Sequence, residues 1–166
     1  MSCVRASLRE QLNGRLVPEL RRLGFEGPPR IAGNALLHEF RRPAGPRGTD
    51  VLVLQMEKHG RPRFLLLVHV EPPEGMEAVM AHGGTVIAGA VTPRRGASSR
   101  HWFRADPGLW QRWTGSPRTL EREAVDACIA LLPEIEAWWS VQQPTQHIAT
   151  WPVTYGSRAG GARSVR

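Results

Sequence analysis

Two apolar runs separated by a short polar segment dominate the middle of the chain. They lie within Val51–Val70 and are joined by His59-Gly60-Arg61-Pro62. Large apolar and β-branched residues on both sides of Gly and Pro are typical of a β-hairpin. Because the loop is short and even-numbered, we expect odd positions of the first strand to face even positions of the second. One face would then carry Val51, Val53 and Gln55 with Phe64, Leu66 and Val68, and the other Leu52, Leu54 and Met56 with Leu65, Leu67 and His69.

Both faces of this hairpin are apolar, so we expect it at the centre of a sheet that is covered on both sides. Two long helices can cover one face, as is common when helices segregate in α+β folds. The second face would need the short helices at 76–80 or around Trp110, or a second subunit. If Leu52, Leu54, Leu65 and Leu67 stand open in the monomer, we expect a dimer through that face.

The first long helix is predicted from about Ala6 to Leu23, where leucines recur at three- and four-residue steps and arginines fall between them. Gly24 is placed to cap its C-terminus, with Phe25 packing back on the last turn. Pro18 lacks a backbone N–H, so we expect a kink there or two shorter helices.

The second long helix follows the start signal Ser116-Pro117 and carries a continuous apolar stripe from Leu120 to Trp138. Pro133 should kink it. The same combination of a capping side chain and proline at Asp106-Pro107 predicts a short helix before it.

The remaining strands are predicted at 35–41, 85–91 and 101–105, with a short helix at 76–80 that ends at Gly83-Gly84. Together these elements indicate one α+β domain: an antiparallel sheet of about five strands built on the Val51–Val70 hairpin and flanked by an N-terminal and a C-terminal helix. We place the domain at residues 1–141. Residues 142–166 are interpreted as a basic tail rich in Gly, Ser and Arg, of which at least the end is disordered.

Composition narrows the protein class. With 166 residues, 41% of them apolar and 22% charged, the chain is long enough for one sizeable core. Its longest apolar run is far too short to span a bilayer, and its N-terminus lacks an apolar block of signal-peptide length, so we expect a cytoplasmic protein without membrane contact. Cys3 lies near a terminus and Cys128 inside an apolar helical pattern, so we expect two free thiols and no disulfide, and neither cysteine has metal-ligand spacing.

The net charge of +7 suggests nucleic acid as a partner, but the distribution of the basic residues gives this reading little support. Lys58 is the single lysine and the other 21 basic residues are arginine, a ratio typical of a GC-rich genome. The arginines are spread along the chain and form no single run. Nucleic-acid association through Arg94, Arg95, Arg100, Arg104 and the basic tail therefore stays an alternative.

A family resemblance rests on the first half of the chain. The residues that carry it are Leu20-Arg21-Arg22-Leu23-Gly24-Phe25, Phe40-Arg41, Val53-Leu54-Gln55 and Phe64-Leu65-Leu66-Leu67-Val68. This order resembles an uncharacterised bacterial domain-of-unknown-function family of small α+β proteins. The resemblance implies an α+β fold and supplies no catalytic residue.

No catalytic motif stands out. His69-Val70-Glu71 is similar to the start of the zinc deaminase signature, but the Pro-Cys-x-x-Cys part is missing. His38, His69 and His101 each fall on a predicted strand and could form a metal site only if they share one face; we expect that they do not. Gln55 interrupts an apolar strand, and with His69 and Glu71 it is a candidate for lining a pocket; the alternative is a structural role for each.

The stretch 101–113, HWFRADPGLWQRW, has the most unusual composition in the chain. Tryptophan and arginine are enriched at protein-binding hot spots, and both also hold single-stranded nucleic acid. The alternative is that Trp102, Phe103 and Trp110 belong to the core. The candidate binding residues are Trp102, Arg104, Trp110 and Trp113.

These observations favour a non-catalytic module that binds another protein or a copy of itself. Nucleic-acid association through Arg and Trp residues is the first alternative, and an enzyme with a site near Gln55, His69 and Glu71 is the second. The missing motifs favour a protein that is not an enzyme, and we expect no cofactor and no bound metal.

Overall fold

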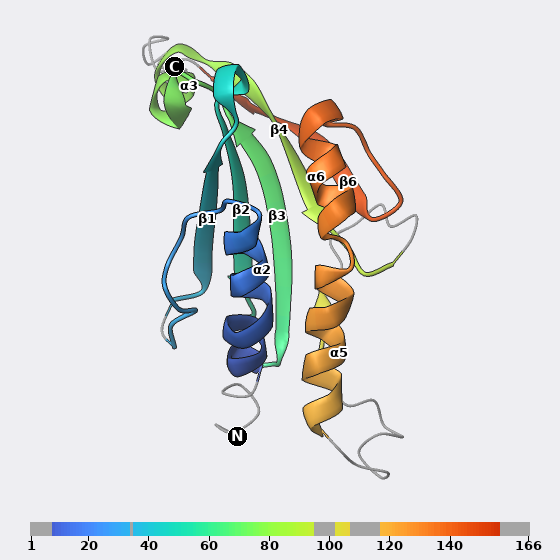
Figure 1. The fold of residues 1–166 in the computed structure, drawn as a ribbon. Helices are drawn as coiled ribbons and strands as arrows, with labels where there is room; N and C mark the ends of the chain where they lie inside the picture. Colours follow the sequence, from blue (N-terminus) through green and yellow to red (C-terminus); the bar gives the residue numbers. More distant parts are fainter. Residues whose placement is uncertain (1–7, 34, 95–101, 107–116, 157–166) are drawn as a thin grey trace, which may run out of the picture.

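The structure is a computed structural model that describes residues 8–33, 35–94, 102–106 and 117–156. Its core is one antiparallel sheet with the strand order β1-β2-β3-β4-β6, and β5 pairs with the start of β3. The fold is therefore α+β, as predicted (Figure 1). The strands are β1 (Leu37–Pro43), β2 (Thr49–Met56), β3 (Arg63–Glu71), β4 (Gly84–Val91), β5 (Phe103–Arg104) and β6 (Ile148–Tyr155); the helices are η1 (Leu12–Leu16), α2 (Val17–Arg22), η2 (Gly45–Arg47), α3 (Gly75–His82), α5 (Pro117–Ile129) and α6 (Leu132–Val141).

The central hairpin consists of β2 and β3, but its register differs by one residue from the predicted one. Met56 pairs with Phe64, so an odd number of residues, 57–63, lies between the paired ends. The loop is wider than His59–Pro62 because the Glu57 carboxylate accepts the backbone N–H groups of His59 and Arg61, at 2.8 and 3.1 Å. As a result Leu52, Leu54 and Met56 share a face with Phe64, Leu66 and Val68, and Val51, Val53 and Gln55 share the other with Leu65, Leu67 and His69.

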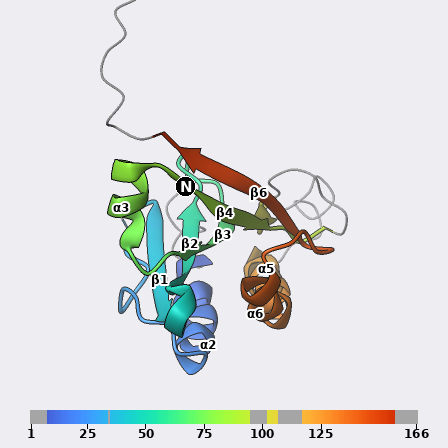
Figure 2. The same cartoon turned by 90° about the horizontal axis from the view of Figure 1, so that it is seen from above.

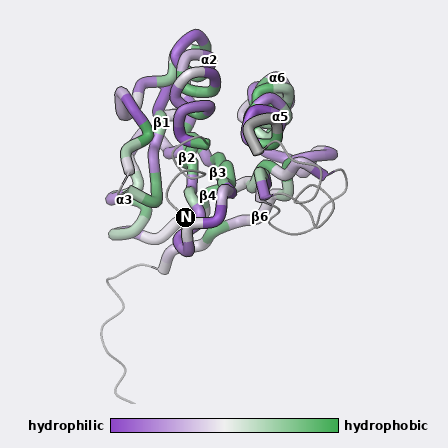
Figure 3. The backbone as a smooth tube through the Cα atoms, turned by 90° about the horizontal axis from the view of Figure 1, so that it is seen from below, coloured by the Kyte–Doolittle hydropathy of each residue, from purple (hydrophilic) through white to green (hydrophobic). Residues whose placement is uncertain are grey.

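The sheet has helices on both sides. Figure 2 shows α2, α5 and α6 on one side, which we call the inner face, and α3 on the other, which we call the outer face. Hydrophobic and hydrophilic residues alternate along α2, α5 and α6 (Figure 3), so each helix can bury one side. The inner-face residues of β2 and β3 form one core cluster with leucines of the N-terminal helix and with Trp138 of α6. Both long helical segments thus cover one face, as expected.

The N-terminal helix passes Pro18 without a break. Its π-helical turn η1 directly precedes α2, and the Val17 N–H donates to the Leu12 carbonyl, five residues earlier. The wider turn accommodates a proline that cannot donate the usual hydrogen bond. The helix ends as predicted: Gly24 has a positive φ of 86° and the Phe25 N–H donates to Leu20 at 2.9 Å.

The C-terminal part of the sheet was not anticipated. Strand β6 pairs with β4 along its whole length, from Gly84↔Tyr155 to Val91↔Ile148. The boundary at residue 141 was therefore wrong, since folded structure continues through Tyr155. Residues 157–166 lie outside the described part of the chain. At its other end β6 is reached from α6, which Pro133 helps to start after a break in the long helix at 130–131.

The four leucines on which the predicted dimer depended do not form one open face. Leu52 and Leu54 are fully buried on the inner face, and Leu65 is buried on the outer face. Leu67 is half-buried. Part of the outer face is covered by α3, whose Val79 packs against Gly84 at the start of β4. Among the described residues, no helix is long and apolar enough to cross a membrane.

Candidate binding surface

The candidate binding surface is the centre of the outer face, across β2, β3, β4 and β6. The register places Val53 beside Leu67, Leu67 beside Ala90, and Ala90 beside Ala149. The neighbouring row runs from Val51 through His69 and Ala88 to Trp151. Several of these side chains are neither buried nor fully exposed, and they define the outer-face patch: Val53, Gln55, Leu67, His69, Ala88, Ala149 and Trp151.

Two of the three pocket candidates lie in this patch. Gln55 pairs with Leu65 and His69 pairs with Val51, so both side chains point to the outer face. They are four residues apart along the sheet, about 13 Å, which is too far for one reaction centre. Neither makes a side-chain hydrogen bond to any described residue. They are therefore isolated polar groups in an apolar surface.

The third candidate, Glu71, has a structural role. One carboxylate oxygen accepts the Met76 N–H at 3.1 Å and so holds the start of α3. The other is engaged by the Arg41 guanidinium, which also bonds Glu39 at 2.7 Å. Glu71 therefore fixes α3 to the edge of the outer face.

The environment of His69 keeps its imidazole neutral. Burial lowers the pKa of His69 below its ordinary value, the nearby Glu39 carboxylate works against this, and Arg41 adds to the lowering. A neutral imidazole offers one donor and one acceptor. At neutral pH the outer-face patch is thus apolar with two uncharged hydrogen-bonding groups.

The strand histidines do not converge. His38 lies on the inner face of β1, opposite Leu54, whereas His69 lies on the outer face. His38 is 4% exposed, and its Nε2 has no hydrogen-bond partner among the described residues. Burial lowers the pKa of His38, against a hydrogen bond with the Ala35 backbone. His101 lies outside the described residues. Within the described ranges no group of three potential metal ligands occurs.

The Trp/Arg stretch is divided between core and surface. Phe103 is buried and stacks on Phe64 with ring centroids 4.9 Å apart, so this part belongs to the core. Trp102 is half-buried and Arg104 is exposed. Trp110 and Trp113 lie outside the described residues.

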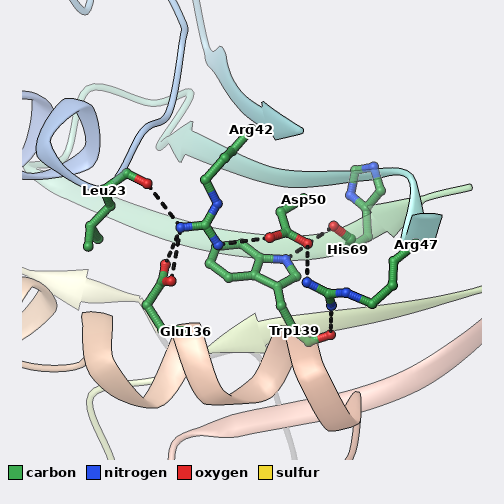
Figure 4. Close-up of polar contacts among 7 residues, drawn as sticks. All are labelled: Leu23, Arg42, Arg47, Asp50, His69, Glu136 and Trp139. Carbon is green, nitrogen blue, oxygen red and sulfur yellow. Dashed lines mark hydrogen bonds and ion pairs between the residues drawn. The ribbon is translucent and has the colours of Figure 1, made fainter. Parts of the chain in front are cut away.

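A partly buried ionic cluster, centred on the buried Asp50, supports the patch from the inner face (Figure 4). Arg42 donates to Glu136 of α6 at 2.9 Å, to Asp50 at 2.8 Å and to the Leu23 carbonyl at 3.0 Å. Its guanidinium also lies over the rings of Phe25 and Trp139, at 4.6 and 5.3 Å from their centroids. Asp50 is 1% exposed, and its second oxygen lies 3.6 Å from Arg47. The cluster therefore locks α6 to β1 and β2.

Trp139 connects this cluster to His69. Its indole Nε1 donates to the His69 backbone carbonyl at 3.3 Å, while the imidazole points to the opposite side of the strand (Figure 4). Because Arg47 also binds the Trp139 carbonyl, α6 is held at two points of the sheet. The position of His69 on the outer face thus depends on packing on the inner face.

Sequence reasoning missed Trp151, because it missed β6. The connection that brings β6 into place is held by Glu134, which accepts the side chain of Thr145 and the backbone N–H of His147 at 3.0 Å. Its second oxygen contacts His147 Nδ1 at 2.7 Å. An alternating Ile-Ala-Thr-Trp-Pro-Val-Thr-Tyr stretch was the available signal.

This Glu134 clamp should respond to acid. Burial alone would raise the pKa of Glu134, but hydrogen bonds from Thr145 and His147 outweigh it and lower the pKa below 4.5. The unfolded chain then binds the proton more readily, so the clamp contributes fully above pH 4.5 and is lost as pH falls through the folded pKa. We expect Glu134→Gln to lower the free energy of unfolding by about 1–2 kcal/mol at pH 7. In urea titrations the gap to the unmodified protein should shrink as pH falls below 4.5; a gap independent of pH would contradict this account.

Comparison of the chain with protein-family models, with curated proteins and with solved structures found no match. The resemblance of the first half to a small α+β family therefore stays a prediction. The function has to be inferred from the surface alone.

Proposed function

We propose that this protein is a non-catalytic module that self-associates through the outer-face patch. The observation that supports the proposal is the patch itself: half-exposed Val53, Leu67 and Trp151 on the sheet face opposite the main helices. Apolar surface shared by several strands is typical of an interaction site rather than of scattered exposed residues.

The edge of the patch favours a second copy as the partner. Leu37, at the start of β1 and opposite Gln55, is 59% exposed, and Glu39 follows on the same face. Arg41 lies two residues further and is paired with Glu39 and Glu71. These two acids and one base carry a net charge of −1, so this face lacks the positive excess of the whole chain, which carries +7. Two copies can bring this face together without the repulsion that the rest of their charge imposes.

The sheet edges are less suitable for association. Pro152 lies in the middle of β6 and cannot donate a ladder hydrogen bond at that edge. At the other edge, the Glu26 backbone already pairs with Arg41 by two hydrogen bonds, of 2.8 and 2.7 Å. This leaves the face as the route by which copies can pack.

Introducing negative charges into the outer face tests the proposal. In the double variant Leu37→Glu with Gln55→Glu, two carboxylates stand side by side on the outer face, and because Leu37 is exposed the fold should persist. We expect the sedimentation coefficient of the unmodified protein to rise with concentration in the micromolar range. The variant should sediment as a monomer throughout, with association weakened at least about tenfold.

The matched control is Val141→Glu with Gln143→Glu, which likewise replaces one exposed aliphatic residue and one glutamine by Glu, at the C-terminal end of α6, where Val141 is 61% exposed. It should associate like the unmodified protein. A monomeric unmodified protein at every concentration would refute self-association. Equal weakening by both variants would move the interface away from the outer face.

A further inference from the structure

The tip of the central hairpin gathers basic side chains from two distant parts of the sequence. β5 pairs antiparallel with the start of β3, with Arg104 opposite Arg63, and the Ala105 N–H donates to the Pro62 carbonyl at 2.9 Å. This brings Arg104 beside the loop that carries Lys58 and Arg61. We call these three residues the basic tip. All three side chains are exposed.

The acids at this end of the sheet are already engaged. Glu57 holds the loop backbone through the His59 and Arg61 N–H groups, and Asp106 is bound by the Arg63 guanidinium. By contrast, the side chains of Lys58, Arg61 and Arg104 donate no hydrogen bond to any described residue, although, against the effect of burial, the charge of Arg61 helps to lower the pKa of Glu57. Their donors are therefore available to an external anion.

An aromatic residue, Trp102, directly precedes β5. Trp102 precedes Arg104 by two residues, and side chains two apart along an extended chain point to the same side. Trp102 is half-buried, so part of its ring can be reached. Phe103 between them is buried against Phe64 and fixes the strand.

We propose that the basic tip binds the phosphate backbone of a single-stranded nucleic acid, with Trp102 as the surface on which a base stacks. Basic groups that follow a backbone, combined with an aromatic ring for the bases, are the elements of single-strand recognition. An acidic polypeptide such as polyglutamate offers the negative charges but no planar base to stack on the half-buried indole. This site lies at the end of the sheet and does not depend on self-association through the outer-face patch.

Charge removal at the tip tests the phosphate contacts. The probe is a fluorescein-labelled oligothymidylate, and its anisotropy is measured over a series of salt concentrations. In the triple variant Lys58→Gln, Arg61→Gln and Arg104→Gln, we expect at least about tenfold weaker binding at low salt. The slope of log K against log salt should fall by about 2, because about 0.7 of a counterion is released per phosphate contact.

The matched control is Arg21→Gln, Arg22→Gln and Arg30→Gln, which removes the same charge at exposed positions outside the tip. It should bind nearly as well as the unmodified protein. Equal losses in both triple variants would reduce the effect to net charge and overturn the site. The absence of any oligothymidylate binding by the unmodified protein would overturn it too.

Substitution of Trp102 tests the stacking step. Trp102→Phe keeps an aromatic face and should retain most of the affinity, whereas Trp102→Leu should lose about five- to tenfold. The circular dichroism spectra of both variants check the fold. Polyglutamate is added as a competitor: we expect it to displace the oligonucleotide poorly. If polyglutamate displaces the oligonucleotide at an equal concentration of negative charge, or if the two Trp102 variants bind with equal affinity, base stacking is refuted. The ligand would then be an acidic polypeptide.

Discussion

Replacing Arg42 by methionine is expected to lower the free energy of unfolding by about 3–5 kcal/mol, measured by urea denaturation. Methionine fills a similar length but leaves Asp50, which is 1% exposed, without its nearest positive charge. It also removes the donors to Glu136 and to the Leu23 carbonyl. Removing one member of such a cluster lowers stability far more than replacing the whole cluster by apolar residues, because a buried charge is left without its partner.

A surface ion pair provides the control for Arg42. Arg22 bonds Glu19 at 2.8 Å but is 70% exposed, so Arg22→Ala should change stability by about 1 kcal/mol or less. The combination Arg42→Met, Asp50→Val and Glu136→Leu should recover much of the loss, since it removes the stranded charges as well. A loss of less than about 1 kcal/mol for Arg42→Met alone would mean that the cluster does not hold α6 to the sheet.

The elements that were predicted well are those whose pattern is local. Leucines at helical spacing located the N-terminal helix. Gly24 marked its end, because the left-handed conformation of a residue that follows a helix depends only on its immediate neighbours. The apolar runs within Val51–Val70 identified the centre of the sheet, because a strand buried on both faces contains few polar residues.

The errors had two sources: a side-chain interaction within the hairpin loop, and pairing between strands distant in sequence. The hairpin register depends on Glu57, whose side chain bonds the loop backbone, and a one-residue shift moves every side chain to the other face. Strand β6 follows a polar segment and contains Pro152, which argues against a strand unless it lies at an edge. Its edge position follows from pairing with β4, about sixty residues earlier, which no local pattern shows.

The candidate surface was predicted only in part. Gln55 and His69 were pocket candidates because they are polar residues on apolar strands, and both lie on the outer face. Glu71 has the same sequence signature, yet it holds α3 and Arg41. Composition cannot separate these cases, because the difference lies in which partners the fold brings within hydrogen-bond distance. For the same reason the buried role of Arg42 was not visible among 21 arginines.

Gly89 shows how a residue can be misjudged from its strand alone. In the sequence it weakens an otherwise favourable β-pattern, because glycine has no side chain to pack. In the structure it lies on the inner face of β4, directly under Trp138. A Cβ atom there would stand 2.8 Å from Ile148, 3.0 Å from Val68 and 3.1 Å from the Trp138 ring. The missing side chain is thus the space into which the indole fits, while the indole N–H donates to Thr150 at 2.9 Å.

Gly89→Val is therefore expected to lower the free energy of unfolding by about 3 kcal/mol, although valine is the better strand former. Ala88→Val, one residue earlier on the half-exposed outer face, should change it by about 0.5 kcal/mol or less. Because Trp138→Leu makes room for the new side chain, the double variant with Gly89→Val should be more stable than the sum of the single losses predicts, by about 1–3 kcal/mol. Urea denaturation of the four proteins of this cycle measures that coupling. A stabilised Gly89→Val protein, or strictly additive losses, would show that Trp138 does not pack against Gly89 in this way.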